Sequence, residues 1–173
     1  MTGTADGLDL GVGDAGDACH YAIGTSSAGV TETHRTRITR DCALAAAHTL
    51  PDAGTQPAFI CVSGRKADST ERGFVMWARV RGAAHNAFLA LPMRAHVLRP
   101  GYIRLLDDAR ASSAPARAFY AATSPLFPVL RRALPDRATS TTAIERAAIV
   151  LGRPENMEST IASSRDINRL AGM

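Results

Sequence analysis

Residues 58–81, AFICVSGRKADSTERGFVMWARVR, contain a short apolar run that ends at Ser63-Gly64, a polar loop, and the start of a segment with helical spacing. An apolar run of four to eight residues that ends at glycine is typical of a buried parallel strand. Large apolar residues recur three or four positions apart from Phe74 to Leu91, and Pro92 follows them. This pattern predicts a strand, a loop and a helix in succession.

The same order of elements extends to both sides of this stretch. Residues 17–24 form a mostly apolar run that ends at glycine, and residues 31–50 form an Ala-rich helical segment that Pro51 ends. Residues 96–103 are a third strand candidate, broken at Pro100-Gly101. Because strands alternate with helices, we predict an α/β fold with a parallel sheet.

The last third of the chain is less regular. Residues 116–134 are apolar and aromatic with internal prolines, which favours two short helices that meet at a kink. A helix is predicted at 143–151, and a short strand at 159–162 is followed by a terminal turn. We expect residues 17–173 to form a single domain, because they are too few for two ordinary ones. Residues 1–16, rich in Gly, Asp and Thr, are expected to be a flexible arm.

A glycine motif in this arm matches a dinucleotide-binding fingerprint but lacks the strand and the helix that flank this fingerprint. Residues 11–16, GVGDAG, fit the Gly-x-Gly-x-x-Gly fingerprint of dinucleotide-binding folds. That fingerprint requires a buried strand before it and a helix after it. Here only LDL precedes it, and the next residues are themselves a strand candidate. We therefore interpret the motif as a loop.

Composition narrows the class of protein. The chain has 173 residues, of which 46% are hydrophobic, enough for one core. No apolar run approaches the roughly 18 residues of a membrane helix, and the start lacks the regions of a signal peptide. The net charge is +4, but the basic residues, nearly all Arg, are scattered without interleaved aromatics. We expect a cytoplasmic protein that binds neither nucleic acid nor membranes.

The three cysteines, at positions 19, 42 and 61, are widely spaced and form no Cys-x-x-Cys pair. Free cysteine is among the most frequently buried residue types. We therefore predict buried, reduced thiols and no metal site.

The predicted strands place several small and polar residues on one rim. In a parallel sheet of this kind, ligands bind outside the carboxyl ends of the strands. The three predicted strands end at Gly24-Thr25, at Ser63-Gly64 and at Arg99-Pro100-Gly101. This rim is the predicted ligand site.

From Asp17 to Leu170 the chain resembles the small bacterial NAD(P)-dependent epimerase/dehydratase-like proteins, atypical members of the short-chain dehydrogenase/reductase superfamily. The resemblance rests on segments that follow the family's order: DACHYAIGTSSAG, AFICVSG, DSTERG, MWARVRG, NAFLALP, LRPGYI, LFPVLRRALP and RDINRLA. It implies a Rossmann-like three-layer sandwich, with helices on both faces of a truncated parallel sheet. It also implies NAD or NADP as cofactor and a small-molecule substrate.

The resemblance assigns roles to individual residues. It implies that Ser63 is the catalytic serine, and the superfamily's Tyr and Lys positions fall on Trp77 and Arg81. An indole N–H can only donate a hydrogen bond, so Trp77 cannot replace Tyr as an acid or base. Arg81 could still hold ribose hydroxyls or a phosphate. The implied cofactor contacts are Gly24, Thr25, Ser63, Arg81, Pro100 and Gly101.

The chain also departs from the family pattern, because the glycine-rich unit that binds the cofactor pyrophosphate is missing. We expect an exposed sheet edge, through which the chain could form homo-oligomers. The alternative function is therefore a non-catalytic remnant that acts as an interaction or oligomerisation module. This module would use the sheet edge and the helices at 119–134. A serine hydrolase is a more distant alternative, since no Gly-x-Ser-x-Gly motif occurs.

Structural roles remain open for the same residues. Ser63 could satisfy a loop backbone, Trp77 could anchor a core or an interface, and Arg81 could belong to a solvated face. His85 occupies a position, one turn after Arg81, where the superfamily often has an acidic residue. No role is assigned to His34, His48 or His96, which lack ligand spacing.

Overall fold

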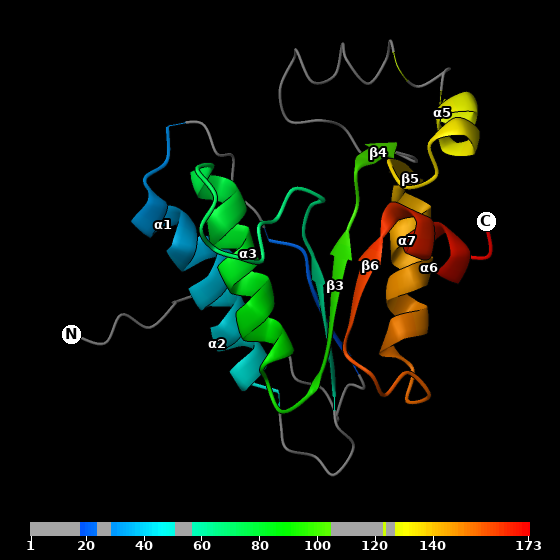
Figure 1. Cartoon of the computed structure of the whole chain (residues 1–173). Helices are drawn as coiled ribbons and strands as arrows, with labels where there is room; N and C mark the ends of the chain where they lie inside the picture. The colour runs from blue at the N-terminus through cyan, green and yellow to red at the C-terminus, as the bar shows by residue number, and fades with distance from the viewer. Residues whose placement is uncertain (1–17, 24–28, 51–56, 105–122, 124–126) are drawn as a thin grey trace.

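The computed structural model describes residues 18–23, 29–50, 57–104, 123 and 127–173. The predicted arm at 1–16, with its glycine motif, and the site residues Gly24 and Thr25 lie outside this part of the chain. A four-stranded parallel sheet crosses the described part in the order β1-β2-β3-β6 (Figure 1). The strands are β1 (Ala18–Tyr21), β2 (Ala58–Val62), β3 (Arg94–Arg99) and β6 (Thr160–Ser163). The predicted α/β class is confirmed.

Helices cover both faces of the sheet, which gives three layers (Figure 1). One face carries α1 (Glu32–Thr36), a π-helical turn (Arg37–Asp41), α2 (Cys42–His48) and α3 (Met76–Leu89). The other face carries α6 (Thr141–Gly152) and α7 (Ser164–Leu170). The helices predicted at 31–50, 74–91 and 143–151 are confirmed.

Strand β2 is buried on both faces, because its side chains alternate between two apolar clusters. Phe59 and Cys61 belong to the cluster under α2 and α3, where the Phe59 ring meets the edge of Phe88 at 5.5 Å between centroids. Ala58 and Ile60 belong to the cluster under α6 and α7. This double burial explains why the strand reads as a continuous apolar run.

The third predicted strand breaks at Pro100-Gly101, as expected, and its second half enters another sheet. After β3 the chain forms β4 (Tyr102–Arg104), which pairs in parallel with β5 (Ala138–Ser140). The sequence did not predict β5. A Cβ on Gly101 would collide with the carbonyl of Arg137, so only glycine allows the two segments to pack this closely. Of the two helices predicted at 116–134, the second is α5 (Phe127–Ala133), and the first, apart from Thr123, lies outside the described residues.

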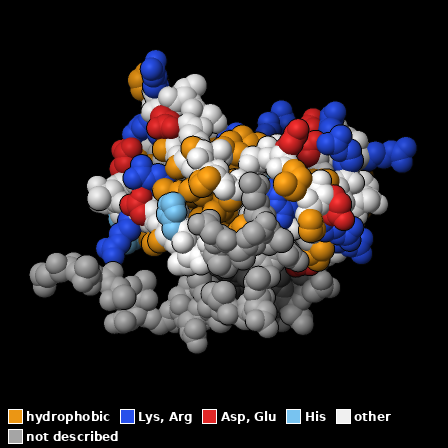
Figure 2. All heavy atoms as spheres, turned by 90° about the horizontal axis from the view of Figure 1, so that it is seen from below, with side chains coloured by type: hydrophobic (Ala, Val, Ile, Leu, Met, Phe, Trp, Pro, Cys, Tyr) orange, Lys and Arg blue, Asp and Glu red, His pale blue; other side chains and the backbone are white. Residues whose placement is uncertain are grey.

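The candidate site lies at one end of the sheet, and the surface at the other end carries apolar and charged side chains. Figure 2 shows the molecule from below Figure 1, at the end where the strands begin. Apolar side chains gather near the middle of this view, and charged ones lie toward its sides. The residues of the candidate site lie at the opposite end, where the strands finish. No helix within the described segments is long and apolar enough to cross a membrane.

The cysteine prediction is correct in part. Cys61 is buried, which raises the pKa of its thiol to about 12, and Cys19 is half-buried. Cys42 is exposed on α2, which corrects the expectation of burial. It begins α2 immediately after the π-helical turn, and an extra residue in such a turn shifts the face on which later side chains lie. Among the described residues no cluster of His, Cys, Asp or Glu could hold a metal ion.

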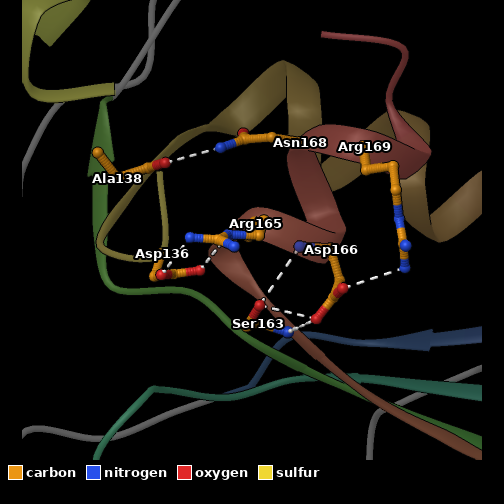
Figure 3. Close-up of polar contacts among 7 residues, drawn as sticks. All are labelled: Asp136, Ala138, Ser163, Arg165, Asp166, Asn168 and Arg169. Carbon is orange, nitrogen blue, oxygen red and sulfur yellow. Dashed lines mark hydrogen bonds and ion pairs between the residues drawn. The ribbon is translucent and has the colours of Figure 1, made fainter. Parts of the chain in front are cut away.

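Helix α7 forms where a terminal turn was predicted, and two reciprocal hydrogen bonds between Ser163 and Asp166 cap its start (Figure 3). The Ser163 hydroxyl accepts a hydrogen bond from the Asp166 backbone N–H, and the Asp166 carboxylate accepts one from the Ser163 backbone N–H. This reciprocal arrangement satisfies two N–H groups that a helix start leaves without partners. The segment SSRDINRL thus contains a helix start that the sequence analysis overlooked.

Side chains of α7 hold the second sheet against the first. Asn168 donates to the Ala138 carbonyl at 2.9 Å (Figure 3). It also accepts from the Thr139 hydroxyl at 2.9 Å. Ser164 accepts from the backbone N–H of Gly101 at 2.9 Å. Because Asn168 and Ser164 are buried, these bonds are protected from water. They fix the turn after β3, which is one side of the predicted ligand site.

Candidate functional site

The residues predicted on the rim lie together at the carboxyl ends of β2 and β3. Ser63 directly follows β2, and its backbone N–H donates to the Leu98 carbonyl at 2.9 Å. Arg81 extends from α3 over the loop after β2: a Cβ on Gly64 would lie 2.7 Å from its Nη1 atom. Trp77 lies one turn earlier, with its ring 5.5 Å from the Arg81 guanidinium carbon.

A groove runs along this rim, with a volume of about 530 Å³. We call it the basic groove. Its walls come from the loops after β2 and β3, from α3 and from the segment before β5. It is lined by Ser63, Gly64, Arg65, Lys66, Trp77, Arg81, Pro100, Gly101, Tyr102, Ile103 and Arg137. Except for Gly24 and Thr25, which are not described, the structure therefore brings the predicted site residues together.

The charged side chains that line the basic groove are all positive. Four of its lining residues, Arg65, Lys66, Arg81 and Arg137, are basic, and none of the described lining residues is acidic. Arg81 forms no ion pair within the described part of the chain. Burial lowers the pKa of Arg81, and the positive charge of Arg35 lowers it further. An anion in the groove would relieve this repulsion.

A second, smaller space of about 210 Å³ lies behind Ser63, between the sheet and the helices α1 and α3. We call it the inner cavity. Ser63 and Arg81 border both spaces, so the two are neighbours. The inner cavity is lined by Tyr21, Ala22, Ile23, Arg35, Thr39, Cys61, Val62, Ser63, Arg81, Ala84, His85 and Phe88.

Ser63 is linked to a buried histidine that the sequence analysis left without a role. The Nε2 atom of His85 lies 2.6 Å from the Ser63 Oγ atom. On the other side of the ring, Arg99 approaches the Nδ1 atom with Nε at 3.0 Å and Nη2 at 2.7 Å. Arg99 also donates to the Ser69 hydroxyl at 3.1 Å. The result is a chain of contacts Arg99–His85–Ser63 from α3 and the ends of β2 and β3.

The direction of hydrogen bonding in this chain follows from Arg99. A guanidinium only donates hydrogen bonds, so the Nδ1 atom of His85 must be the acceptor. The neutral imidazole then carries its proton on Nε2, and this N–H donates a hydrogen bond to the Ser63 Oγ atom. The pKa of His85 is lowered to about 3, first by burial and then by the charges of Arg99 and Arg81. His85 is therefore neutral at physiological pH.

The hydrogen bond between His85 and Ser63 runs in the opposite direction from the one that activates a serine nucleophile. In a catalytic triad the histidine accepts the serine proton, and a carboxylate stabilises the imidazolium that forms. Here His85 faces a cation in place of a carboxylate, and it already donates to Ser63. The geometry leaves the Ser63 O–H to point at another acceptor. The site can thus offer a fixed hydrogen-bond donor but not an activated serine, which argues against the hydrolase alternative.

The loop before α3 supports the same site. The Asp68 carboxylate accepts hydrogen bonds from Thr70 and from the Gly73 backbone, and these bonds lower the pKa of Asp68. A Cβ on Gly82 would collide with the Asp68 carbonyl, so this glycine lets the loop lie directly on α3. The loop carries Ser69, which holds Arg99 in place.

Sequence reasoning noted His85 one turn after Arg81 but gave it no role beside Ser63, and it did not predict Arg35 in the inner cavity. The role of His85 could have been inferred from this spacing, because residues four apart lie on the same face of α3. Arg35 gave no comparable signal. No family model and no curated protein matches this chain, so the family resemblance seen in the sequence stays a prediction.

The lowered pKa of His85 predicts a specific dependence of stability on pH. In the unfolded chain the imidazole binds a proton near pH 6.5, whereas in the folded chain it does so only near pH 3. Its contribution to the free energy of unfolding is therefore complete above pH 6.5 and is lost as the pH falls toward 3. Between pH 7.5 and pH 5 the loss is about 2 kcal/mol.

Urea unfolding at pH 7.5, 6 and 5 measures this loss. Gln in the H85Q variant can accept from Arg99 and donate to Ser63 but cannot titrate, so its loss of stability should be smaller by that amount. The H48Q variant, which changes an exposed histidine, serves as the matched control. Equal pH slopes for the wild type and H85Q would show that the assignment of His85 is wrong.

Proposed function

We propose that the chain binds an NAD(P)-type dinucleotide in the basic groove, as an epimerase- or oxidoreductase-like protein without standard Tyr-Lys proton transfer. The observation that carries the proposal is the groove itself, with four basic side chains and no acidic one among its described lining residues. Phosphate groups favour such a surface, and Arg offers two parallel donors to them. The groove's volume is also within the range of small-molecule sites.

The geometry also suggests how the parts of a dinucleotide would be held. Arg65, Lys66 and Arg137 are exposed and can reach phosphates, while Arg81 lies deeper beside Ser63. The half-buried Trp77 offers an aromatic face for a base or a nicotinamide ring. Ser63 would donate a hydrogen bond to an oxygen of the bound small-molecule substrate. A cytoplasmic location, where such cofactors are available, is part of the proposal.

No proton-transfer step is assigned to Trp77 or Arg81. An indole N–H cannot act as a general acid or base at neutral pH, and a guanidinium keeps its proton. The neutral His85 is not placed for this role either, because its basic nitrogen is occupied by Arg99. The proposal is therefore ligand binding with a polarising serine, and any catalysis would need a proton carrier from the ligand or from solvent.

Tryptophan fluorescence tests this proposal directly, because Trp77 is the chain's only tryptophan. NADH or NADPH should quench it in a saturable way at concentrations up to about a millimolar. In the K66Q variant the affinity should fall about tenfold, because a charge-assisted hydrogen bond is lost. The matched control is R40Q, whose arginine pairs with Asp41 on the helical segment between α1 and α2.

Two results would overturn the proposal. One is the absence of quenching by both cofactors at a millimolar concentration. The other is an equal loss of affinity in K66Q and R40Q, which would reveal only a general effect of charge. Titration with AMP in parallel separates recognition of phosphate from recognition of the whole dinucleotide.

Self-association of the chain is a second candidate function, favoured by its exposed apolar side chains. Phe74 is fully exposed just before α3, and Val129 of α5 is 66% exposed. Strands β1 and β6 are the edges of the described sheet. A second copy of the chain could cover these features, since exposed edges and apolar patches mark interaction surfaces.

Light scattering at tens of micromolar distinguishes this candidate. A dimer in the wild type that becomes a monomer in F74S would support association through the start of α3. M157S, which removes another exposed apolar side chain, should leave the dimer intact as the control. A wild-type chain that is monomeric throughout this concentration range would contradict the candidate.

A further inference from the structure

The inner cavity has more apolar side chains in its walls than the basic groove has. Seven of its twelve lining residues are apolar and come from β1 and the residues after it, from β2 and from α3, including Tyr21, Ile23, Val62 and Phe88. At about 210 Å³ it is somewhat larger than an apolar cavity of about 150 Å³ that holds benzene in another protein. The cavity can therefore take a small molecule with an apolar body, but not a nucleotide.

Two arginines face the same small space. Arg35 of α1, which is 2% exposed, and Arg81 of α3 both line the cavity. The charge of Arg35 lowers the pKa of Arg81, which shows that the two guanidinium groups repel each other. None of the described lining residues is an Asp or a Glu. Positive charge concentrated in a partly apolar cavity favours an anionic ligand.

Ser63 adds directional recognition to this charge. Its Oγ atom accepts a hydrogen bond from the Nε2–H of His85, as derived above, so its own O–H is available to a ligand oxygen. A half-buried hydroxyl donor next to a guanidinium matches the two oxygens of a carboxylate. Thr39 also lines the cavity and offers a further hydroxyl.

From these features we infer that the inner cavity binds a small organic carboxylate, with its charged group between Arg35, Arg81 and Ser63 and its apolar body against Phe88 and Val62. The inference does not depend on nucleotide binding in the basic groove. The two sites share Ser63 and Arg81, so a carboxylate in the cavity would lie beside a ligand in the groove.

Benzoate and benzamide form a suitable pair of probes, because they have nearly the same shape and differ in charge. Saturation-transfer NMR with the full chain should detect benzoate at millimolar concentrations. Benzamide should bind at least tenfold more weakly, since it lacks the charge. Equal binding of the two probes would overturn the inference, as would displacement of benzoate by an equal concentration of inorganic phosphate.

Variants locate the site. R35M replaces the buried guanidinium with an apolar side chain of similar length and should weaken benzoate binding at least tenfold. R37M, two residues away at an exposed position, is the matched control and should bind as the wild type does. Unchanged affinity in R35M would overturn the inference. If R35M does not fold, R35K provides a second test: it keeps the charge, and benzoate should still bind more tightly than benzamide.

The same variants separate this inference from the proposed function. R35M should weaken NADH quenching of Trp77 much less than it weakens benzoate binding, because Arg35 does not line the basic groove. K66Q should leave benzoate binding unchanged, because Lys66 does not line the inner cavity. Loss of benzoate binding in K66Q, at unchanged stability, would contradict the separation of the two sites.

Discussion

The contact between Arg99 and the Nδ1 atom of His85 determines the chemistry of the candidate site. Because the guanidinium can only donate, it fixes the tautomer of the imidazole and turns its proton toward Ser63. The serine is thereby held as a donor to a ligand and is not activated as a nucleophile. A carboxylate in place of Arg99 would give the opposite polarity. The positive charge of Arg99 at the end of β3 thus makes this site suited to ligand binding and not to hydrolysis by Ser63.

The fold explains how this contact forms. Three segments meet at the carboxyl rim: the end of β2 with Ser63, the end of β3 with Arg99, and the middle of α3 with His85. Parallel pairing of β2 with β3 brings the first two together, and packing of α3 on these strands adds the third. Helix α7 holds the turn after β3 through Ser164, so the rim depends on the end of the chain as well.

Much of this fold could be predicted from the sequence, because apolar runs that end at glycine and helices that end at proline are local signals. The rim residues Ser63, Pro100 and Gly101 followed from the same signals, whereas Arg81 was implied only by the family resemblance. The short strand β5 could not be predicted, since its pairing with β4 is non-local. The role of His85 was also hidden, because it depends on Arg99, a residue fourteen positions away whose approach only the fold creates.

The tautomer of His85 is the most direct test of this account. NMR of the ¹⁵N-labelled protein, with H85Q for assignment, reports which ring nitrogen carries the proton. The account predicts a neutral ring at pH 5 with the proton on Nε2. A proton on Nδ1, or a doubly protonated ring at that pH, would contradict it, because either form would leave Arg99 facing an N–H donor.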